Sequence, residues 1–282
     1  MTAADQDKPM GVGKQVLLYA LLALLGLVFL LPFFWMVSSS LKAPEEIFAP
    51  TPQWIPKEIK WSNYYDAMTV MPFGRFIRNS LVVAACVVIG NLLSASLVAY
   101  GFAYFRFPLR GPLFILLLAT MMLPGQVTMI PIFKLFSYLG WIDTYKPLIV
   151  PAFCGPAFFV FLYRQFFLAL PRDLFEAAKV DGCSPLRIYW SIVLPLAKPV
   201  SITVAIFSFM GAWNDFMGPL IYLTSESKFT LALGLAQFSG QYVSEWHLLM
   251  AASVVAVLPC IVLFFVFQRY FIRGIATTGM KG

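Results

Sequence analysis

The 282-residue chain is 60% hydrophobic and only 12% charged, and its formal net charge is +7. Soluble domains average about 25% charged residues, so this composition excludes an ordinary soluble domain and indicates a membrane protein. Apolar runs near twenty residues recur, long enough to cross a hydrocarbon core of about 30 Å as helices and without the alternation of β-barrel strands. We therefore expect an all-α polytopic membrane protein whose basic residues mark cytoplasmic loops rather than nucleic-acid binding.

The N-terminal part predicts a short cytoplasmic segment, residues 1–14, followed by a first span at 15–37. A cleaved signal peptide is the alternative, since Lys14 precedes the apolar run. The run is longer than a typical signal-peptide core and no A-x-A-like cleavage site follows, which favours an uncleaved anchor. Residues 38–78 form the longest polar loop, which we place outside, on the membrane surface.

The second predicted span, 79–105, carries small residues every fourth position at Ala95, Ala99 and Ala103. Such a face lets another helix approach closely. Asn91 is polar within the same span. Two interpretations of Asn91 remain open: a hydrogen bond between helices, and a place in the wall of a transport pathway.

The third predicted span, 111–136, is interrupted by Pro124-Gly125-Gln126 and by Pro131. Membranes tolerate such breaks where protein or a water-filled cavity satisfies the freed backbone groups. Met122 and Gln126 are therefore candidates for a pathway wall. A fourth span is predicted at 147–167.

A polar interruption, residues 170–198, separates the fourth and fifth spans. Asp173 and Glu176 have the spacing of a capping box, which predicts a helix beginning at about residue 174. Gly182 is predicted to end that helix in the left-handed conformation. Ser184-Pro185 has the pattern of an N-cap followed by proline at the first helical position. An ordinary amphipathic connector would show the same local features.

The fifth predicted span, 199–223, contains the most polar cluster of any span, Trp213-Asn214-Asp215. An ionisable residue inside a membrane helix indicates function, because its burial is costly unless it faces water or a partner. A short helix at about 229–238, too short to span, is predicted to be re-entrant or to lie on the outer surface. The sixth span is predicted at 247–267, and the membrane domain at 15–270 as a whole.

The basic residue distribution predicts the orientation. With six spans and the tail 271–282, both termini lie on one side. Twelve of the 20 Lys and Arg but only five of the 13 acids then fall on that side. The positive-inside rule makes it the cytoplasmic side. Arg75 and Arg78, just before the second span, run against the rule.

The interruption at 170–198 matches a longer pattern: E-A-A, three residues, Gly, nine residues, then I-x-L-P. The chain resembles here the EAA loop of the inner-membrane permease subunits of ABC importers. Other segments are similar to carbohydrate-importing members of that family, of the maltose type. These are Ser40-Leu41-Lys42 to Asn63-Tyr64, Pro131 to Thr144, Trp213-Asn214-Asp215-Phe216, and Gln268 to Gly282.

The resemblance implies a multi-pass subunit of a bacterial-type cytoplasmic (inner) membrane that works with a second homologous permease, two ATPase subunits and an extracytoplasmic sugar-binding protein. ATP and Mg would be used by the ATPase partner, so this chain would be no enzyme, with no catalytic residue, metal or bound cofactor. The tail would also contact the ATPase, through Gly279, Met280, Lys281 and Gly282. The ATPase-coupling residues implied by the resemblance are Glu176, Ala177, Ala178, Asp181, Gly182, Leu194 and Pro195.

A sugar, being neutral, needs hydroxyl-bonding amides and aromatic faces rather than a charged filter. Helix packing is the alternative role for each candidate. The predicted pathway residues are Trp213, Asn214, Asp215, Gln126, Met122 and Asn91.

The sequence leaves three alternatives to a sugar-importing permease. An importer of the same architecture could carry another solute, such as glycerol 3-phosphate. A secondary transporter or channel would show coupling-ion acids in mid-membrane, and only Asp215 approaches that. A membrane enzyme would need paired catalytic groups or a metal site, which the single His247 and the scattered acids do not supply. The chain contains no P-loop motif, G-x-x-x-x-G-K-[ST], of its own.

Overall fold

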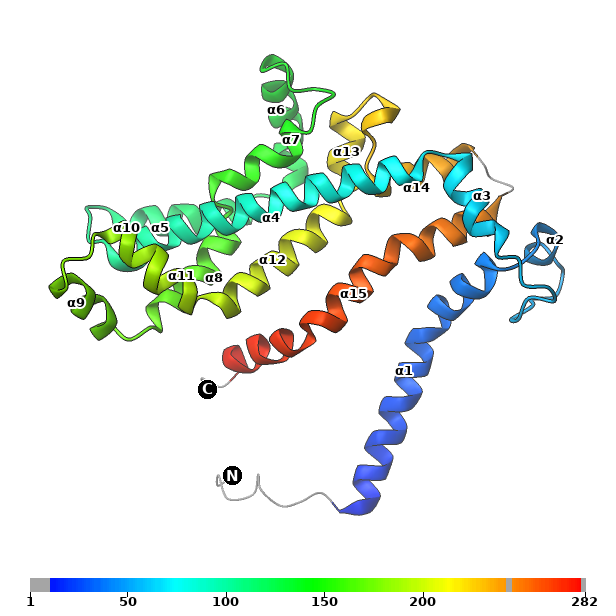
Figure 1. Ribbon diagram of the computed structural model, residues 1–282, viewed down its shortest axis with the longest axis horizontal. Helices are drawn as coiled ribbons and strands as arrows, with labels where there is room; N and C mark the ends of the chain where they lie inside the picture. The colour runs from blue at the N-terminus through cyan, green and yellow to red at the C-terminus, as the bar shows by residue number, and fades with distance from the viewer. Residues whose placement is uncertain (1–10, 242–244, 280–282) are drawn as a thin grey trace. The chain divides into compact units, whose positions relative to one another are not determined.

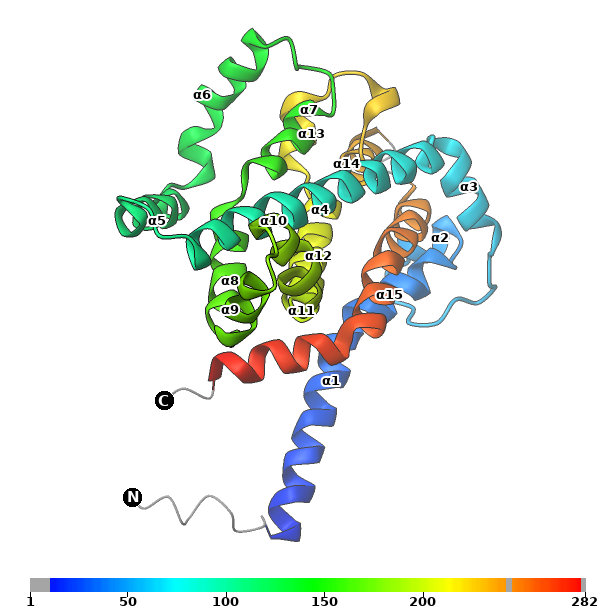
Figure 2. The same cartoon turned by 60° about the vertical axis from the view of Figure 1, so that its left-hand side comes forward.

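A computed structural model describes the backbone of residues 11–241 and 245–279, and over those residues it is helical with no strand. The all-α prediction is confirmed. The chain forms two compact units, one of Met1–Val70 with Ser239–Val255 and one of Met71–Phe238 with Ala256–Gly282. Figures 1 and 2 give two views of the helices.

The described helices give between four and six candidate spans, against the six that the sequence predicts. Four are long and apolar enough to cross a membrane: Val12–Ser40, Phe73–Tyr104, Lys146–Leu168 and Trp246–Gln268. Two further pairs pass the same test but are bent, Arg110–Met122 with Gly125–Tyr138 by 99° and Pro185–Leu196 with Lys198–Trp213 by 78°. Counting each bent pair as one span gives six.

The first unit contains α1 (Val12–Ser40), α2 (Pro44–Ile47), α3 (Ser62–Val70) and the N-terminal part of α15 (Trp246–Gly279). Its polar loop folds around Lys42, which is fully buried. The Lys42 ammonium lies 4.0 Å from the centre of the Trp35 ring and donates to the Gln53 carbonyl. Asn63 Nδ2 donates to the carbonyls of Ser40 and Lys42, each at 2.9 Å. The predicted surface loop is therefore anchored to the end of α1.

The second unit is built on α4 (Phe73–Tyr104), which packs against α8 and α12 (Figure 1). The predicted small-residue face is confirmed, since Ala95 and Ala99 are fully buried and Ala103 nearly so. Small side chains here let the neighbouring helices approach closely. The other helices of this unit are α5 (Arg110–Ala119), η2 (Thr120–Met122), α6 (Gly125–Tyr138), α7 (Lys146–Ile149), η3 (Val150–Cys154), α8 (Ala157–Leu168), α9 (Asp173–Val180), α10 (Pro185–Ile188), η4 (Tyr189–Val193), α11 (Leu194–Leu196), α12 (Lys198–Trp213), α13 (Met217–Tyr222), η5 (Glu226–Lys228) and most of α14 (Leu231–Gln241).

Three predicted boundaries differ from the structure. The second span begins at Phe73 rather than 79, so Arg75 and Arg78 lie within α4. The helix of the fifth predicted span, α12, ends at Trp213 rather than near residue 223, because the chain turns at residues 214–216 and a new helix, α13, begins at Met217. The chain after residue 270 stays helical through Gly279, since each added residue of a helix adds one backbone hydrogen bond.

The turn between α6 and α7 is joined to the segment before α14 through Asp143. This residue adopts a left-handed backbone, φ 57°, which aspartate tolerates better than most residues. Its carboxylate accepts hydrogen bonds from the backbone N–H groups of Thr224 and Ser225 at 3.0 and 2.9 Å. The Lys228 ammonium lies 2.7 Å from Asp143 Oδ2. On the other side, Asn79 Nδ2 donates to the carbonyls of residues 227 and 229, each at 3.0 Å.

We expect Asp143→Asn to lower the unfolding temperature at neutral pH, because Lys228 loses its ionic partner. The Lys228 ammonium, followed by hydrogen bonds from Ser225, holds the pKa of Asp143 far below its usual value of about 4. A depressed folded-state pKa stabilises the fold above the unfolded-state pKa, and that stability is lost as the pH falls. The difference between wild type and variant should stay constant from about pH 8 to about pH 5 and shrink below about pH 4.

The measurement is thermal unfolding of the purified full chain in detergent. Asp66→Asn removes an exposed carboxylate of α3 and is the matched control, with no expected change at neutral pH. A deficit of D143N that persists undiminished at about pH 3 would contradict the ionic role of Asp143.

Candidate functional site

The polar interruption begins with α9, whose two faces differ sharply. Phe175 and Ala178 are buried, at 5% and 4% exposure, while Glu176, Ala177 and Lys179 are exposed. Phe175 stacks against Tyr104 of α4 with ring centres 3.9 Å apart. Ala178 therefore packs against its own subunit, contrary to the expectation that both alanines face a partner.

The start of α9 differs from the predicted capping box. Asp173 is already the first helical residue, Arg172 occupies the N-cap position, and no side chain caps the helix. Arg172 has helical backbone angles, so the turn after residue 170 already points into the helix. Asp173 and Glu176 still place negative charge in the first turn, where the helix dipole favours it.

The end of α9 is confirmed as a glycine stop. Gly182 has φ +75°, its N–H donates to the Lys179 carbonyl, and the Cys183 N–H donates to the Ala178 carbonyl, each at 3.0 Å. This pair of bonds is the Schellman motif. Ser184 then caps the next helix by accepting from the Arg187 N–H at 3.3 Å, as predicted.

Beyond the cap, the chain does not form the simple closing turn expected at Leu194-Pro195. α10 passes into a π-helical turn, η4, and on through α11, so that Leu194 and Pro195 lie inside a continuous helical segment. The break comes at Ala197, and α12 leaves at 78° to the preceding segment. Pro195 and Pro199 flank that break, and a proline cannot supply the N–H that a continuous helix needs.

Tyrosine hydroxyls tie this loop to the transmembrane helices. Tyr189 is buried, and its hydroxyl lies 2.7 Å from Ser96 Oγ on α4. Tyr100 donates to the Pro185 carbonyl at 3.0 Å, while Tyr104 donates to the Phe167 carbonyl at 2.8 Å and joins α4 to the end of α8, just before the loop. Each buried bond of this kind contributes about 1 kcal/mol, and the aromatic packing adds to it. The loop is therefore part of the core of the second unit.

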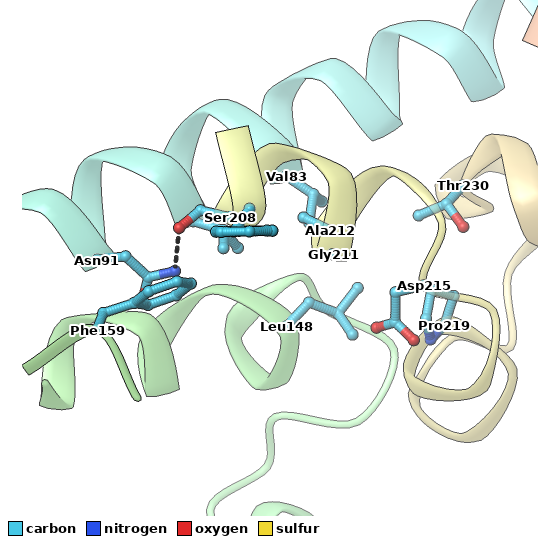
Figure 3. Close-up of a pocket in the computed structure, with 12 residues that line it drawn as sticks. Val83, Asn91, Leu148, Phe159, Ser208, Gly211, Ala212, Asp215, Pro219 and Thr230 are labelled. Atoms are coloured by element: carbon cyan, nitrogen blue, oxygen red, sulfur yellow. Dashed lines mark hydrogen bonds between the residues drawn. The ribbon is translucent and has the colours of Figure 1, made fainter. Parts of the chain in front are cut away.

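A separate cavity of about 250 Å³ lies further along the same unit, between α4, α7, α8, α12 and α13 (Figure 3). At one end Asn91 donates to Ser208 Oγ at 2.8 Å. At the other end Asp215 accepts from the Gly218 N–H at 3.0 Å. Its lining is Val83, Val87, Asn91, Leu148, Phe159, Phe207, Ser208, Gly211, Ala212, Asp215, Pro219 and Thr230.

Two buried acceptors of this cavity, Asn91 Oδ1 and Thr230 Oγ1, have no hydrogen-bond partner among the described residues. Buried polar atoms are nearly always paired, and an unpaired one beside a cavity suits a hydroxyl donor or water. Sequence reasoning missed Ser208 and Thr230. A serine within an apolar span was the available signal for Ser208, whereas nothing local marks Thr230.

The structure brings two of the predicted pathway residues, Asn91 and Asp215, to one cavity and leaves the others elsewhere. Trp213 is 4% exposed, and its indole N–H donates to the Ala256 carbonyl at 3.0 Å. Asn214 is exposed, with Nδ2 donating to the Met210 carbonyl at 2.8 Å. Met122 and Gln126 are exposed at the bend between η2 and α6.

Two predicted features concern ligands and the tail. Among the described residues, no three His, Cys, Asp or Glu side chains group as metal ligands would. Of the tail residues predicted to contact a partner, Gly279 ends α15, while Met280, Lys281 and Gly282 lie outside the described residues.

The sequence was compared with known protein families and with individual relatives. Residues 91–277 match the family described as "Binding-protein-dependent transport system inner membrane component". The chain is 36% identical to the arabinooligosaccharides transport system permease protein AraQ of Bacillus subtilis (strain 168), over 92% of this chain and 93% of that protein. It is 34% identical to the sn-glycerol-3-phosphate transport system permease protein UgpE of Pectobacterium atrosepticum, over 82% of this chain and 85% of that protein.

A solved structure shares the fold. A chain of a bacterial ABC transporter involved in the import of the acidic polysaccharide alginate superposes with a TM-score of 0.82, covering 96% of this chain and 99% of that one at 23% identity. Helical spans, matched family and relatives along nearly the whole length agree. The chain is therefore a multi-pass inner-membrane permease of the binding-protein-dependent transport system family.

Proposed function

We propose that this permease is a subunit of an ATP-driven importer that moves a sugar, from mono- to oligosaccharide or polyol, delivered by an extracytoplasmic binding protein. A second homologous permease would complete the pore, and two ATPase subunits would use ATP and Mg outside this chain. The observation that carries the proposal is α9: its buried face is fixed to α4, and its other face, with Glu176 and Ala177, is exposed.

Docking on α9 would couple an ATPase to the pore. The exposed set of Glu176, Ala177, Asp181 and Gly182 would contact the ATPase, with both termini and this loop in the cytoplasm. Because Phe175 and Tyr189 are locked to α4, a push on α9 would move α4 rather than bend the loop alone. Rocking of packed helices between two arrangements is an established way to switch access.

The solute class is argued from the relatives and from the 250 Å³ cavity. One relative is named for arabinooligosaccharides and another for sn-glycerol 3-phosphate. Glycerol 3-phosphate is the second candidate, and an anion of that kind is normally held by Arg or Lys. The polar residues that line the cavity are Asn91, Ser208, Asp215 and Thr230, and no Arg, Lys or His lines it within the described part of the chain. This lining favours a neutral, hydroxyl-rich solute.

Within that proposal, Asn91 and Asp215 would bond sugar hydroxyls directly. Trp213 would hold the end of α12 against α15 through its bond to the Ala256 carbonyl, without contacting the sugar. The part of the pathway wall that faces the second permease would include Asn214, Met122 and Gln126, since these residues are exposed in this chain.

Glu176→Lys should reduce binding-protein-stimulated ATP hydrolysis to the basal rate, because it reverses the charge on the exposed face of α9. Asp173→Lys is the matched control. It makes the same charge change in the same first turn but lies outside the proposed docking residues. The measurement is ATP hydrolysis by the reconstituted importer with its binding protein. Equal losses in both variants would show a general charge effect and contradict the docking role.

Gly182→Val should abolish coupling while the chain still inserts, because a β-branched residue is strained at φ +75° by roughly 1–2 kcal/mol. Gly182→Asn should keep most activity, since asparagine tolerates this conformation. No atom lies within 4 Å of a Cβ added at this position, so packing does not confound the comparison. The measurements are substrate-stimulated ATPase activity and transport. Similar activity of the Gly182→Val and Gly182→Asn variants would show that coupling does not depend on the left-handed backbone at this position.

Asn91→Ala should lower uptake by about 5- to 30-fold, from the loss of one or two hydrogen bonds at about 1 kcal/mol each. Ser253→Ala is the control, since its hydroxyl bonds the Leu249 carbonyl in the first unit. Trp213→Phe should change uptake less than Trp213→Ala, which also loses about 3–5 kcal/mol of packing. Normal uptake by N91A would remove Asn91 from the pathway.

A further inference from the structure

A second cavity, of about 480 Å³, lies where α4, α5, α8 and α9 meet. Its walls include the last residues of two candidate spans, Tyr104 and Leu168, and the first residue of a third, Arg110. The ends of transmembrane helices lie near the headgroup region of a bilayer. The cavity therefore opens at the level where phospholipid headgroups are found.

The charge of this cavity is one-sided. Of the residues that the structure describes, four cations line it, Arg106, Arg110, Arg172 and Lys179, against one carboxylate, Glu176. No ion pair joins any of these five among the described residues. Four like charges around one cavity repel each other, which favours an anionic occupant.

The arginines keep donors for such an occupant. The Arg110 guanidinium makes two long bonds, to the Phe105 carbonyl at 3.3 Å and to the Ala103 carbonyl at 3.4 Å. A guanidinium has five N–H donors, so several remain. A phosphate suits the paired donors of arginine particularly well.

Apolar side chains share the wall with these cations. Phe105 and Leu168 are 43% and 42% exposed, and Leu170 is partly exposed beside them. A soluble phosphate gains nothing from such neighbours, whereas acyl chains do, at about 0.8 kcal/mol per buried methylene. Basic pockets between transmembrane helices are a known setting for anionic lipid headgroups.

We propose that this cavity binds the phosphate headgroup of an anionic phospholipid, with Arg106, Arg110, Arg172 and Lys179 around the phosphate and Phe105 and Leu168 against the acyl chains. The bound lipid neutralises the repulsion between Arg106 and Arg110, in the turn from α4 to α5, and Arg172 and Lys179 of the α9 segment, and so holds α9 in place. This site requires a membrane location, which the family establishes, and does not depend on the sugar. Because Glu176 lines both this cavity and the proposed ATPase-docking face, the lipid must stay bound when the chain assembles with its ATPase.

The test is thermal unfolding of the purified full chain in neutral detergent, with native mass spectrometry of retained lipid. The added probes are dioleoylphosphatidylglycerol, dioleoylphosphatidylcholine and inorganic phosphate. The variant R106Q/R172Q removes two cations of the cavity. The matched control R187Q/K198Q removes two exposed cations of the same loop that do not line it.

Phosphatidylglycerol should raise the unfolding temperature of wild type and control alike and should be retained by both. For R106Q/R172Q, at least ten times more lipid should be needed for the same rise, while phosphatidylcholine protects none of the three. If the double variant does not fold, the single exposed R106Q should show a smaller loss in the same direction.

Four results would overturn the proposal. The first is an equal response to phosphatidylglycerol in the cavity variant and the control, and the second is protection by phosphatidylcholine equal to that by phosphatidylglycerol. The third is protection by inorganic phosphate that matches the lipid and depends on the same arginines. The fourth is loss of the retained lipid when the chain assembles with its ATPase. The third would assign the cavity to a soluble anion and the fourth to the ATPase interface. Sugar uptake is not measured, so failure of the transport proposal would not affect the outcome.

Discussion

The close packing of α4 against α8 and α12 is the constraint on which the second unit depends. It is possible because Ala95, Ala99 and Ala103 present almost no side chain to the neighbouring helices. Gly90 extends the same requirement, since a Cβ there would lie 2.8 Å from the Phe153 ring. A membrane offers no hydrophobic drive for helix association, so close backbone approach and dispersion contacts must supply it. Larger residues at these positions would separate the helices that position both the loop and the cavity.

Hydrogen bonds from polar side chains attach two further segments to α4. At one end the Tyr189 hydroxyl and Ser96 hold the 170–198 loop against α4, and at the other Asn79 of α4 holds the segment before α14. Each of these bonds is formed where an unpaired polar atom would be costly. One helix thus links both ends of the unit, and in the proposed mechanism it would transmit a push on α9 along its length.

The two cavities of this unit differ in charge, and the difference follows from their surroundings. The smaller one is lined mainly by apolar and neutral polar residues with the single carboxylate of Asp215, while the larger one is dominated by arginine and lysine. Charges inside a bilayer are expensive, whereas cations at helix ends reach water and headgroups. The chain therefore places a cavity of mainly apolar and neutral polar lining between the helices of this unit, and a basic cavity at the helix ends.

Residues that act through their local backbone chemistry could be recognised from the sequence alone. The apolar runs set the all-α class and the six spans, Gly182 and Ser184 set the helix stop and restart, and the alanine repeat marked the packing face. The spacing from Glu176 to Pro195 identified the family, which the comparisons confirm. Each of these signals depends on residues close in the chain, where propensity and hydrogen-bond geometry suffice.

The tertiary structure alone decided which distant residues meet. Asn91 meets Ser208 across 117 positions, and Trp213 turns its N–H to Ala256 although its neighbours pointed to a pathway. The capping box failed at Asp173 because the preceding turn already had helical angles, and the fifth span ended early at residues 214–216. Side-chain direction and helix breaks of this kind follow from packing between segments, which no local pattern specifies. The sequence therefore determined the family and the elements, and the packing of α4 determined the loop anchor and the two cavities.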